Sequence, residues 1–338
     1  MGYWNMDSSF KDKTCIIVMA NYDDWLSIAH IVPVLDGELF KLGLKGRVVI
    51  VDDSSDNVDG KEILPTLSLS AIQTIDEIQL GNNQGNQRAL AIGVAYVAKN
   101  AKCDYLVVMD SDNEDKPEHV RDLLMACSEH NDKKIIFAER SKRSEGRAFR
   151  LSYWFYKWLF KRVAGISVSV GNFSVIPGHL IRRISHISTL WNHFPISIIR
   201  SGLPHRKYPL ERGTRLFGKG KTSFVKLIVH AFSGIVIYTD VIAVRIMLLT
   251  ILSGLIFIFI VALVVVIWLG TDVLIPGWTS QFLTQIFSLF VLVLCTVTIV
   301  LILILSLRMQ PPMVPYHDHG RFIYEISRIF PPDDEGQT

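Results

Sequence analysis

The chain has 338 residues, with 35 Lys and Arg against 32 Asp and Glu, a formal net charge of +3 and 49% hydrophobic residues. This length accommodates one large domain and a smaller part. The lack of a recognition motif argues against a nucleic-acid-binding protein, and four scattered cysteines without metal or redox spacing argue against a cysteine-based metal or redox site.

The small net charge hides two oppositely charged regions. Residues 1–139 hold 13 Lys and Arg against 23 Asp and Glu, a net −10, whereas residues 140–226 hold 18 against 2, a net +16. A basic stretch that precedes long apolar segments favours anionic lipid or phosphate as a partner. We therefore predict a phosphate site close to a membrane.

Short apolar strands and helical segments alternate along the first half. Residues 14–20, 47–51, 77–80 and 105–109 fit strands, and residues 25–42, 87–99 and 117–129 fit helices, with Pro117 in a first helical turn. Such alternation predicts a mostly parallel, Rossmann-like α/β sheet. Ligands of such sheets bind at the carboxyl ends of the strands.

Two acidic clusters follow predicted strands. Residues 109–120 read MDSDNEDKPEHV, which fits a solvated acidic turn, a calcium loop or a clamp for a divalent metal. An EF-hand loop starting at Asp110 would need Gly and Glu where Asp115 and Arg121 stand, so the calcium loop is excluded. The second cluster, Asp52 and Asp53, ends another strand of the same predicted sheet.

Together the clusters fit one metal-nucleotide ligand. The second cluster would accept hydrogen bonds from the base or ribose, and the first would hold a hard cation against phosphates. Mg²⁺ or Mn²⁺ suits such a site, because one or two carboxylates plus phosphate oxygens satisfy it.

Two later segments are apolar enough to cross a bilayer. Residues 246–269 and 282–307 contain no charged residue, and each exceeds the roughly 20 residues that a spanning helix needs. The alternative is a pair of buried core helices. The connector 270–281 lacks Lys and Arg, whereas Arg245 and Arg308 flank the other side, so positive-inside reasoning places both termini in the cytoplasm.

Amphipathic segments are expected beside these spans. Residues 150–162, RLSYWFYKWLFKR, place large apolar residues on one helical face among basic ones, which fits an interfacial helix or an ordinary amphipathic core helix. Residues 221–245 are expected to be a juxtamembrane segment. Beyond the second span, residues 308–338 are expected to form a cytoplasmic tail with a short helix over 321–330.

Seven motifs in order carry a resemblance to a known family. They are ANYDD (20–24), VDDSSD (51–56), NNQGNQRAL (82–90), DSDNEDKPE (110–118), RSKR (140–143), GNF (171–173) and RGTRLFGKGK (212–221). With the two spans, this series resembles family-2 glycosyltransferases of the polyprenyl-phosphate type, such as dolichol-phosphate mannose synthases and bacterial undecaprenyl-phosphate sugar transferases. The resemblance covers about residues 14–307 and implies a GT-A domain.

The resemblance also implies roles for individual residues. The metal ligands would be Asp110, Asp112 and Glu114; donor contacts would come from Asp110 and from Asp24, Asp52, Asp53, Asn83 and Gly85; and Arg140, Arg143, Arg212, Arg215 and Lys221 would face the donor pyrophosphate and the acceptor phosphate. Asn172 would be catalytic with Asp112, although it stands where the family often has Asp. For each basic residue the alternative is a contact with a lipid headgroup.

The activity so implied is transfer of one sugar from a UDP- or GDP-linked nucleotide-sugar to a polyprenyl phosphate, undecaprenyl or dolichyl, with inversion and with Mg²⁺ or Mn²⁺. The expected organisation is a cytoplasmic catalytic domain (1–220), a juxtamembrane segment (221–245), a membrane hairpin (246–307) and a tail (308–338). Alternatives are a transferase to another lipid acceptor and a non-catalytic membrane protein that binds lipid phosphate or nucleotide-sugar. A homo-oligomer is left open.

Overall fold

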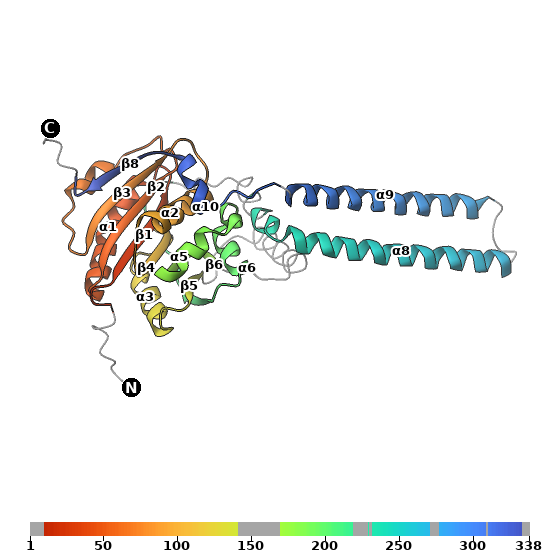
Figure 1. The fold of residues 1–338 in the computed structure, drawn as a ribbon, viewed down its shortest axis with the longest axis horizontal. Coiled ribbons are helices and arrows are strands. Elements are labelled where there is room, and N and C mark those ends of the chain that lie inside the picture. Colours follow the sequence, from red (N-terminus) through yellow and green to blue (C-terminus); the bar gives the residue numbers. More distant parts are fainter. Residues whose placement is uncertain are drawn as a thin grey trace. The chain divides into compact units, whose positions relative to one another are not determined.

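The computed structural model describes residues 10–140, 170–218, 229, 232–270, 277–308 and 310–332. Its contacts divide the chain into two units (Figure 1). The first unit draws on the ranges Met1–Trp154, Ser167–Ile237 and Met313–Thr338, and the second on Phe155–Ile166 and Tyr238–Pro312.

The first unit is built on one sheet of eight strands. In spatial order they are β7 (His205–Leu210), β5 (Ile135–Arg140), β6 (Val170–Pro177), β4 (Tyr105–Asp110), β1 (Thr14–Asn21), β2 (Lys45–Asp52), β3 (Ile72–Leu80) and β8 (Ile323–Phe330). The strands β6 and β8 run antiparallel to their neighbours, and the other pairings are parallel. The carboxyl ends of β1, β2, β4, β5 and β7 therefore meet at one edge, where β6 begins.

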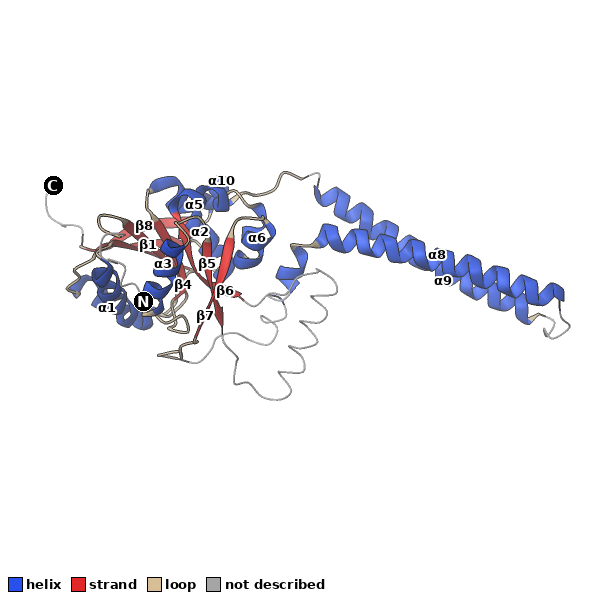
Figure 2. Cartoon of the chain, turned by 90° about the horizontal axis from the view of Figure 1, so that it is seen from below, coloured by secondary structure: helices blue, strands red, loops and turns tan. Residues whose placement is uncertain are grey.

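Helices cover both faces of this sheet (Figure 2). On one face α1 (Trp25–Leu42), α3 (His119–Glu129) and the 3-10 turn η2 (Lys61–Thr66) pack on alternate strand residues such as Ile17. On the other face lie α2 (Asn86–Asn100), α5 (Gly178–Ser185), η3 (Ser188–Trp191) and α6 (Phe194–Arg200), which pack on residues such as Val18. Because both faces are buried, the central strands are continuously apolar rather than alternating.

The predicted mostly parallel α/β sheet is confirmed, and α1 has the predicted bounds. The strand predicted over 77–80 is longer and begins at Ile72. Its first half contains Asp76, a buried carboxylate that accepts hydrogen bonds from Arg47 at 2.7 Å and Arg328 at 3.1 Å. This ion-paired carboxylate interrupts the apolar pattern by which a strand is predicted from sequence. Pro117 was expected in the first turn of the helix, but it lies in the turn that precedes α3.

The helix predicted over 321–330 is wrong. After a short helix α10 (Pro315–Asp318) and the turn η4 (His319–Arg321), the chain forms β8, which pairs antiparallel with β3. Apolar residues at 323, 326 and 329 mimic helical spacing, but the open edge of β3 supplies backbone partners that an isolated segment lacks. The predicted separate tail over 308–338 is also corrected, because its described part from Met313 belongs to the first unit.

The second unit contains two long apolar helices that run side by side in both views (Figures 1 and 2). They are α8 (Thr239–Gly270) and α9 (Trp278–Arg308). By length and composition, residues Thr239–Gly270 and Ser280–Ser306 are sufficient to cross a membrane, and each range contains an 18-residue stretch with a mean hydropathy of 3.1. Their side chains are largely exposed in the described chain, which is unfavourable in water and ordinary in lipid. The amphipathic helix predicted over 150–162 lies outside the described residues.

Helix α2 packs closely against the sheet at Gly93. A Cβ at Gly93 would lie 2.6 Å from Cγ1 of Val18 and 2.8 Å from Cγ2 of Val51. Such overpacking costs about 1–3 kcal/mol, so Gly93→Ala should lower the free energy of unfolding despite its better helix propensity. Chemical denaturation of the detergent-solubilised chain would measure this change.

Gly37→Ala is the matched control, because Gly37 is also helical and a Cβ there meets nothing within 4 Å. It should stabilise the chain by about 0.5–1 kcal/mol. Equal stability of the two variants would contradict the close packing at Gly93.

Candidate functional site

Polar side chains from four strands meet at the carboxyl edge of the sheet. Asn21, Asp52 and Asp110 are the last residues of β1, β2 and β4, and Asn172 lies near the start of the antiparallel strand β6. Their grouping follows from topology, since parallel strands end at the same edge and an antiparallel strand begins there. The two acidic clusters predicted from sequence are thus brought to one edge.

The second acidic cluster is held by internal hydrogen bonds. The side chain of Asp52 accepts from Asn21 Nδ2 at 2.8 Å and from the Ser55 hydroxyl at 2.5 Å, which ties the loops after β1 and β2 together. Asp53 accepts from the backbone N–H groups of Gln84 and Gly85 at 2.6 and 2.8 Å. Both aspartates are buried. These contacts give the pair a structural role, and their contact with a nucleotide stays a prediction.

The loop that Asp53 anchors leads directly into α2. Gly85 is the N-cap residue of that helix with φ +87°, a conformation that favours glycine over residues with a side chain. Asn83 stands exposed two residues before it. Asn83 and Gly85, which the resemblance assigns to donor contacts, therefore lie at this edge of the sheet, at the beginning of a helix.

The first acidic cluster concentrates negative charge in a part-buried place. Oδ1 of Asp110 accepts from Nδ2 of Asn86 at 3.1 Å and from Nδ2 of Asn172 at 3.2 Å. Burial, with the charge of Asp110 added to it, raises the pKa of Asp112 to about 6, although the backbone N–H of Glu114 and the charge of Arg215 oppose the shift. A pKa raised in this way marks two carboxylates close together in a poorly solvated place.

A segment after β7 lies against this acidic loop. We call residues 211–217 the strap. Arg212 pairs with the carboxylate of Glu114, whose backbone oxygen accepts from Gly213 N at 2.9 Å. Asn113 Nδ2 donates to the backbone oxygen of Thr214 at 3.0 Å. These contacts hold the strap along the loop between β4 and α3.

Arg215 joins two loops of the edge through its guanidinium group. It pairs with Asp24, the N-cap residue of α1, and donates to Oδ2 of Asp112 at 3.1 Å. All three side chains are less than a fifth exposed. A planar guanidinium offers several donors in fixed directions, so it can serve two carboxylates at once. Arg215 is the main cation that opposes the charge of Asp112.

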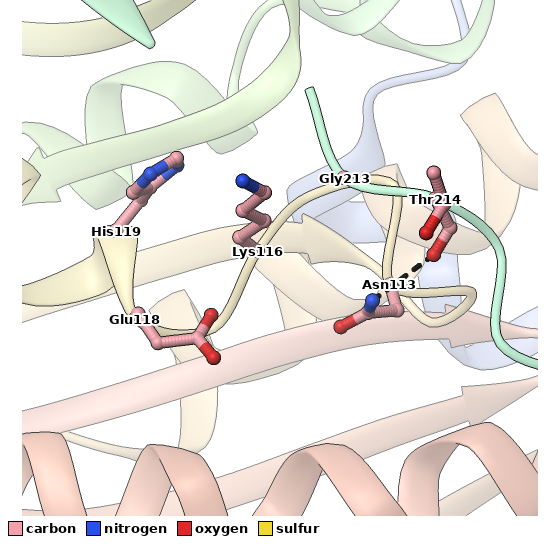
Figure 3. Close-up of a pocket in the computed structure, with 6 residues that line it drawn as sticks. All are labelled: Asn113, Lys116, Glu118, His119, Gly213 and Thr214. Atoms are coloured by element: carbon pink, nitrogen blue, oxygen red, sulfur yellow. Dashed lines mark hydrogen bonds between the residues drawn. The ribbon is translucent and has the colours of Figure 1, made fainter. Parts of the chain in front are cut away.

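An open pocket of about 330 Å³ borders the strap on the side of α3 (Figure 3). Figure 3 shows Lys116 and His119 rising from the loop and the start of α3, with Gly213 and Thr214 of the strap opposite. Asn113 and Glu118 complete the lining. The pocket mixes acidic and basic groups, and neither Asp110 nor Asp112 is among its lining residues.

Some predicted residues cannot be placed. Arg143 and Lys221 lie outside the described residues, and of Arg140 only the backbone is described, as the last residue of β5. Within the described ranges, no three His, Cys, Asp or Glu side chains converge in a way that would hold a metal ion. Glu114, the predicted third ligand, pairs with Arg212 instead. The ligand set therefore stays a prediction.

The structure adds amide groups that the sequence prediction passed over. Asn86 and Gln87 begin α2, and Asn21 ends β1; all three hydrogen bond to residues of the edge. The available signal was the motif NNQGNQRAL, in which amides follow a glycine at the start of a helix. The resemblance assigns roles only to Asn83 and Gly85 within this motif.

Residues 17–186, about half of the chain, match the model of glycosyl transferase family 2. The chain belongs to this family. It is therefore a nucleotide-sugar glycosyltransferase with a GT-A domain, and the predicted enzyme class is confirmed. The match ends before β7, so the strap and the two apolar helices lie outside it.

Solved structures of similar fold include two glycosyltransferases. Mannosyl-3-phosphoglycerate synthase from Rubrobacter xylanophilus is 13% identical with a TM-score of 0.47, over 80% of this chain and 80% of that chain. Glucosyl-3-phosphoglycerate synthase from Mycobacterium tuberculosis, in complex with Mn²⁺, UDP-glucose and phosphoglyceric acid, is 10% identical with a TM-score of 0.46, over 69% and 82%. No curated protein sequence matches the chain.

In this transferase, Asp110 and Asp112 fit a divalent cation by the chemistry of their donors. Carboxylate oxygens are the ligands that Mg²⁺ and Mn²⁺ prefer, and two of them suffice when phosphate oxygens and water complete the shell. The raised pKa of Asp112 marks the negative charge that such a cation would compensate. A divalent cation is therefore compatible with this pair.

We expect the contacts of Arg215 with Asp24 and Asp112 to hold the strap in position. Arg215→Gln removes its charge from Asp24 and Asp112, and hydrogen bonds to charged groups contribute about 1.5–3 kcal/mol each. We expect faster hydrogen–deuterium exchange across residues 211–217 and a loss of about 1–3 kcal/mol of stability. Mass-spectrometric exchange with a denaturation series would measure both.

Arg206→Gln provides the control, because Arg206 is exposed on β7 and surface substitutions change stability by about 0.5 kcal/mol or less. If both variants left the exchange of the strap unchanged, the bridging role of Arg215 would be refuted.

Proposed function

We propose that this family-2 transferase moves a single sugar from a UDP- or GDP-linked nucleotide-sugar to a polyprenyl phosphate, undecaprenyl or dolichyl, at the cytoplasmic face of a membrane. The observation that carries the proposal is one chain that joins a glycosyltransferase domain to two helices apolar enough to cross a bilayer. A lipid-linked acceptor reacts at the membrane surface, so an enzyme anchored there meets it in two dimensions. The excess of basic residues over 140–226 fits an anionic membrane and an acceptor phosphate.

The acidic edge would receive the donor. Asp110 and Asp112 would hold Mg²⁺ or Mn²⁺, which when bound supplies positive charge to the departing nucleoside diphosphate. Asn83 and Gly85 lie on the loop where α2 begins, a place whose backbone N–H groups attract phosphate. Asp24, Asp52 and Asp53 frame the neighbouring part of the edge and would orient the nucleoside.

The strap supplies cationic groups beside that edge. The guanidinium groups of Arg212 and Arg215 form ion pairs with Glu114 and Asp112, respectively. The same N–H donors suit the oxygens of a pyrophosphate or of an acceptor phosphate. We extend this role to Arg140, Arg143 and Lys221 from the motif series alone. Each could equally contact lipid headgroups.

The reaction needs little acid–base chemistry from the protein. A phosphate monoester has a second pKa of about 6 and is already an anion near neutral pH, so its oxygen can attack the anomeric carbon in line and invert it. The residues of the edge would then act by holding donor and acceptor in position and by stabilising charge on the leaving group. Asn172 is compatible with this scheme, because its amide would hold a neighbouring group in position and the reaction does not require it to take a proton.

A donor screen tests the activity. Full-length protein in nanodiscs would receive Mg²⁺ or Mn²⁺, a polyprenyl phosphate and one labelled UDP- or GDP-sugar at a time, with and without chelator. We expect chelator-sensitive labelling of lipid from one donor. Binding of a nucleotide-sugar without labelled lipid from any donor would contradict the polyprenyl phosphate acceptor, and labelling of a non-lipid phosphate monoester or of another lipid would name the alternative.

The paired aspartates can be tested in the same assay. Asp112→Asn keeps the size of the side chain but removes a charged ligand, and since loss of a group that merely supports a metal ligand costs about 10–100-fold, we expect at least about a 100-fold loss of turnover. Asp59→Asn alters an exposed aspartate and should leave turnover unchanged. Full turnover of Asp112→Asn would exclude Asp112 as a metal ligand.

A further inference from the structure

A chain of hydrogen bonds runs from the start of α6 to the acidic edge. The backbone N–H of Phe194 donates to Oε1 of Gln87 at 2.6 Å. Nε2 of Gln87 donates to Oδ1 of Asn172 at 3.0 Å, and Nδ2 of Asn172 donates to Oδ1 of Asp110 at 3.2 Å. The four residues come from α6, α2, β6 and β4, which are separate in sequence.

The first bond of the chain fixes the direction of the others. A backbone N–H can only donate, so the Gln87 amide must turn its oxygen toward Phe194. Its NH₂ group then faces Asn172, which must accept with its own oxygen. The NH₂ group of Asn172 is left facing Asp110. The orientation of two amides, each of which could otherwise point either way, is thus set by one backbone group.

Burial keeps water from substituting for these contacts. Phe194 is 0% exposed and Asn172 is 8% exposed, and Gln87 is half-buried between them. The Ser174 hydroxyl also donates to the backbone oxygen of Asn172 at 3.0 Å, which fixes the strand next to the amide. A buried polar network of this kind constrains geometry because each member that loses its partner is left unsatisfied.

This direction accounts for an amide at position 172. An aspartate there would accept from Gln87 but would present a second negative oxygen to Asp110, where Asn172 presents a donor. The amide therefore holds the Asp110 carboxylate without adding charge to an edge that already carries Asp112 and Glu114. Asn86 Nδ2 donates to the same oxygen of Asp110 at 3.1 Å, so this carboxylate accepts hydrogen bonds from two neutral amides.

We propose that Gln87 is a positioning residue for the donor site: by orienting the amide of Asn172 toward Asp110, it holds that carboxylate in the geometry that binds a divalent cation with the nucleotide. The inference rests on the proposed function in so far as Asp110 binds a cation. It assigns Gln87 a role that acts wholly through Asn172.

The test is Gln87→Glu, which keeps size and keeps an oxygen for the Phe194 N–H. The second carboxylate oxygen at position 87 faces Asn172 and can only accept a hydrogen bond. Asn172 must then turn its NH₂ group toward position 87 and its oxygen toward Asp110. Loss of a group that orients a metal ligand costs about 10–100-fold in affinity. We expect Mn²⁺ affinity, titrated by electron paramagnetic resonance with UDP or GDP present, to fall about 10-fold or more. A single cooperative thermal transition would show that the variant still folds, even with a lower midpoint.

A double-mutant cycle separates positioning from general structural support. In an Asn172→Ala background the amide that Gln87 orients is gone, so Gln87→Glu should change Mn²⁺ affinity by less than about 2-fold; coupling of this kind marks residues of one network. Gln73→Glu is the matched control, because Gln73 is exposed on β3, and it should match the wild type.

The outcomes are distinct. Additive effects of Gln87→Glu and Asn172→Ala, or unchanged Mn²⁺ affinity in Gln87→Glu, would overturn the positioning role. A wild type that binds no Mn²⁺ with either nucleotide would overturn both the metal assignment and this inference. A wild type that binds Mn²⁺ with nucleotide but labels no polyprenyl phosphate would overturn the acceptor proposal only, and the affinity comparison would still decide the role of Gln87.

Discussion

Repulsion between Asp110 and Asp112 is the constraint around which the rest of the edge is arranged. The two carboxylates lie two residues apart at the end of β4 in a part-buried place, and burial, with the charge of Asp110 added to it, raises the pKa of Asp112. A sheet whose parallel strands end together must gather such groups, because each strand brings its own terminal side chains to one edge. Asn86, Asn172 and Arg215, which contact the pair, act as hydrogen-bond donors or as a counter-charge.

These neighbours are of two chemical kinds, which act differently. The guanidinium groups of the strap compensate charge, and ionic contacts of this kind can be exchanged when another anion or cation arrives. The amides of Asn86, Gln87 and Asn172 supply direction without net charge, and Gln87 is anchored away from the edge by the backbone of Phe194. The edge thus combines an exchangeable part with a fixed part, a combination that suits a site at which a charged donor enters and a charged product leaves.

The sequence allowed the central architecture to be predicted, because the buried strands are unbroken apolar runs and α1 has clear helical periodicity. It also placed Asp110 and Asp112 at a strand end. It could not show that Asp53 binds the backbone of residues 84 and 85, since a carboxylate that anchors a loop and one that binds a nucleotide look alike in sequence. The role of Gln87 was equally hidden, because it depends on Phe194, more than a hundred residues away.

Strand β8 gives the chain an order of assembly. The sheet is continued at β3 by a strand that is synthesised after both apolar helices. Until then β3 has an open edge, with backbone groups that could pair with any extended segment. The buried carboxylate of Asp76 also lacks the hydrogen bond from Arg328 until β8 has formed. Completion of the catalytic domain is thereby coupled to completion of the hairpin, so a chain that stalls within α8 or α9 carries a sheet that is still unfinished and open to aggregation.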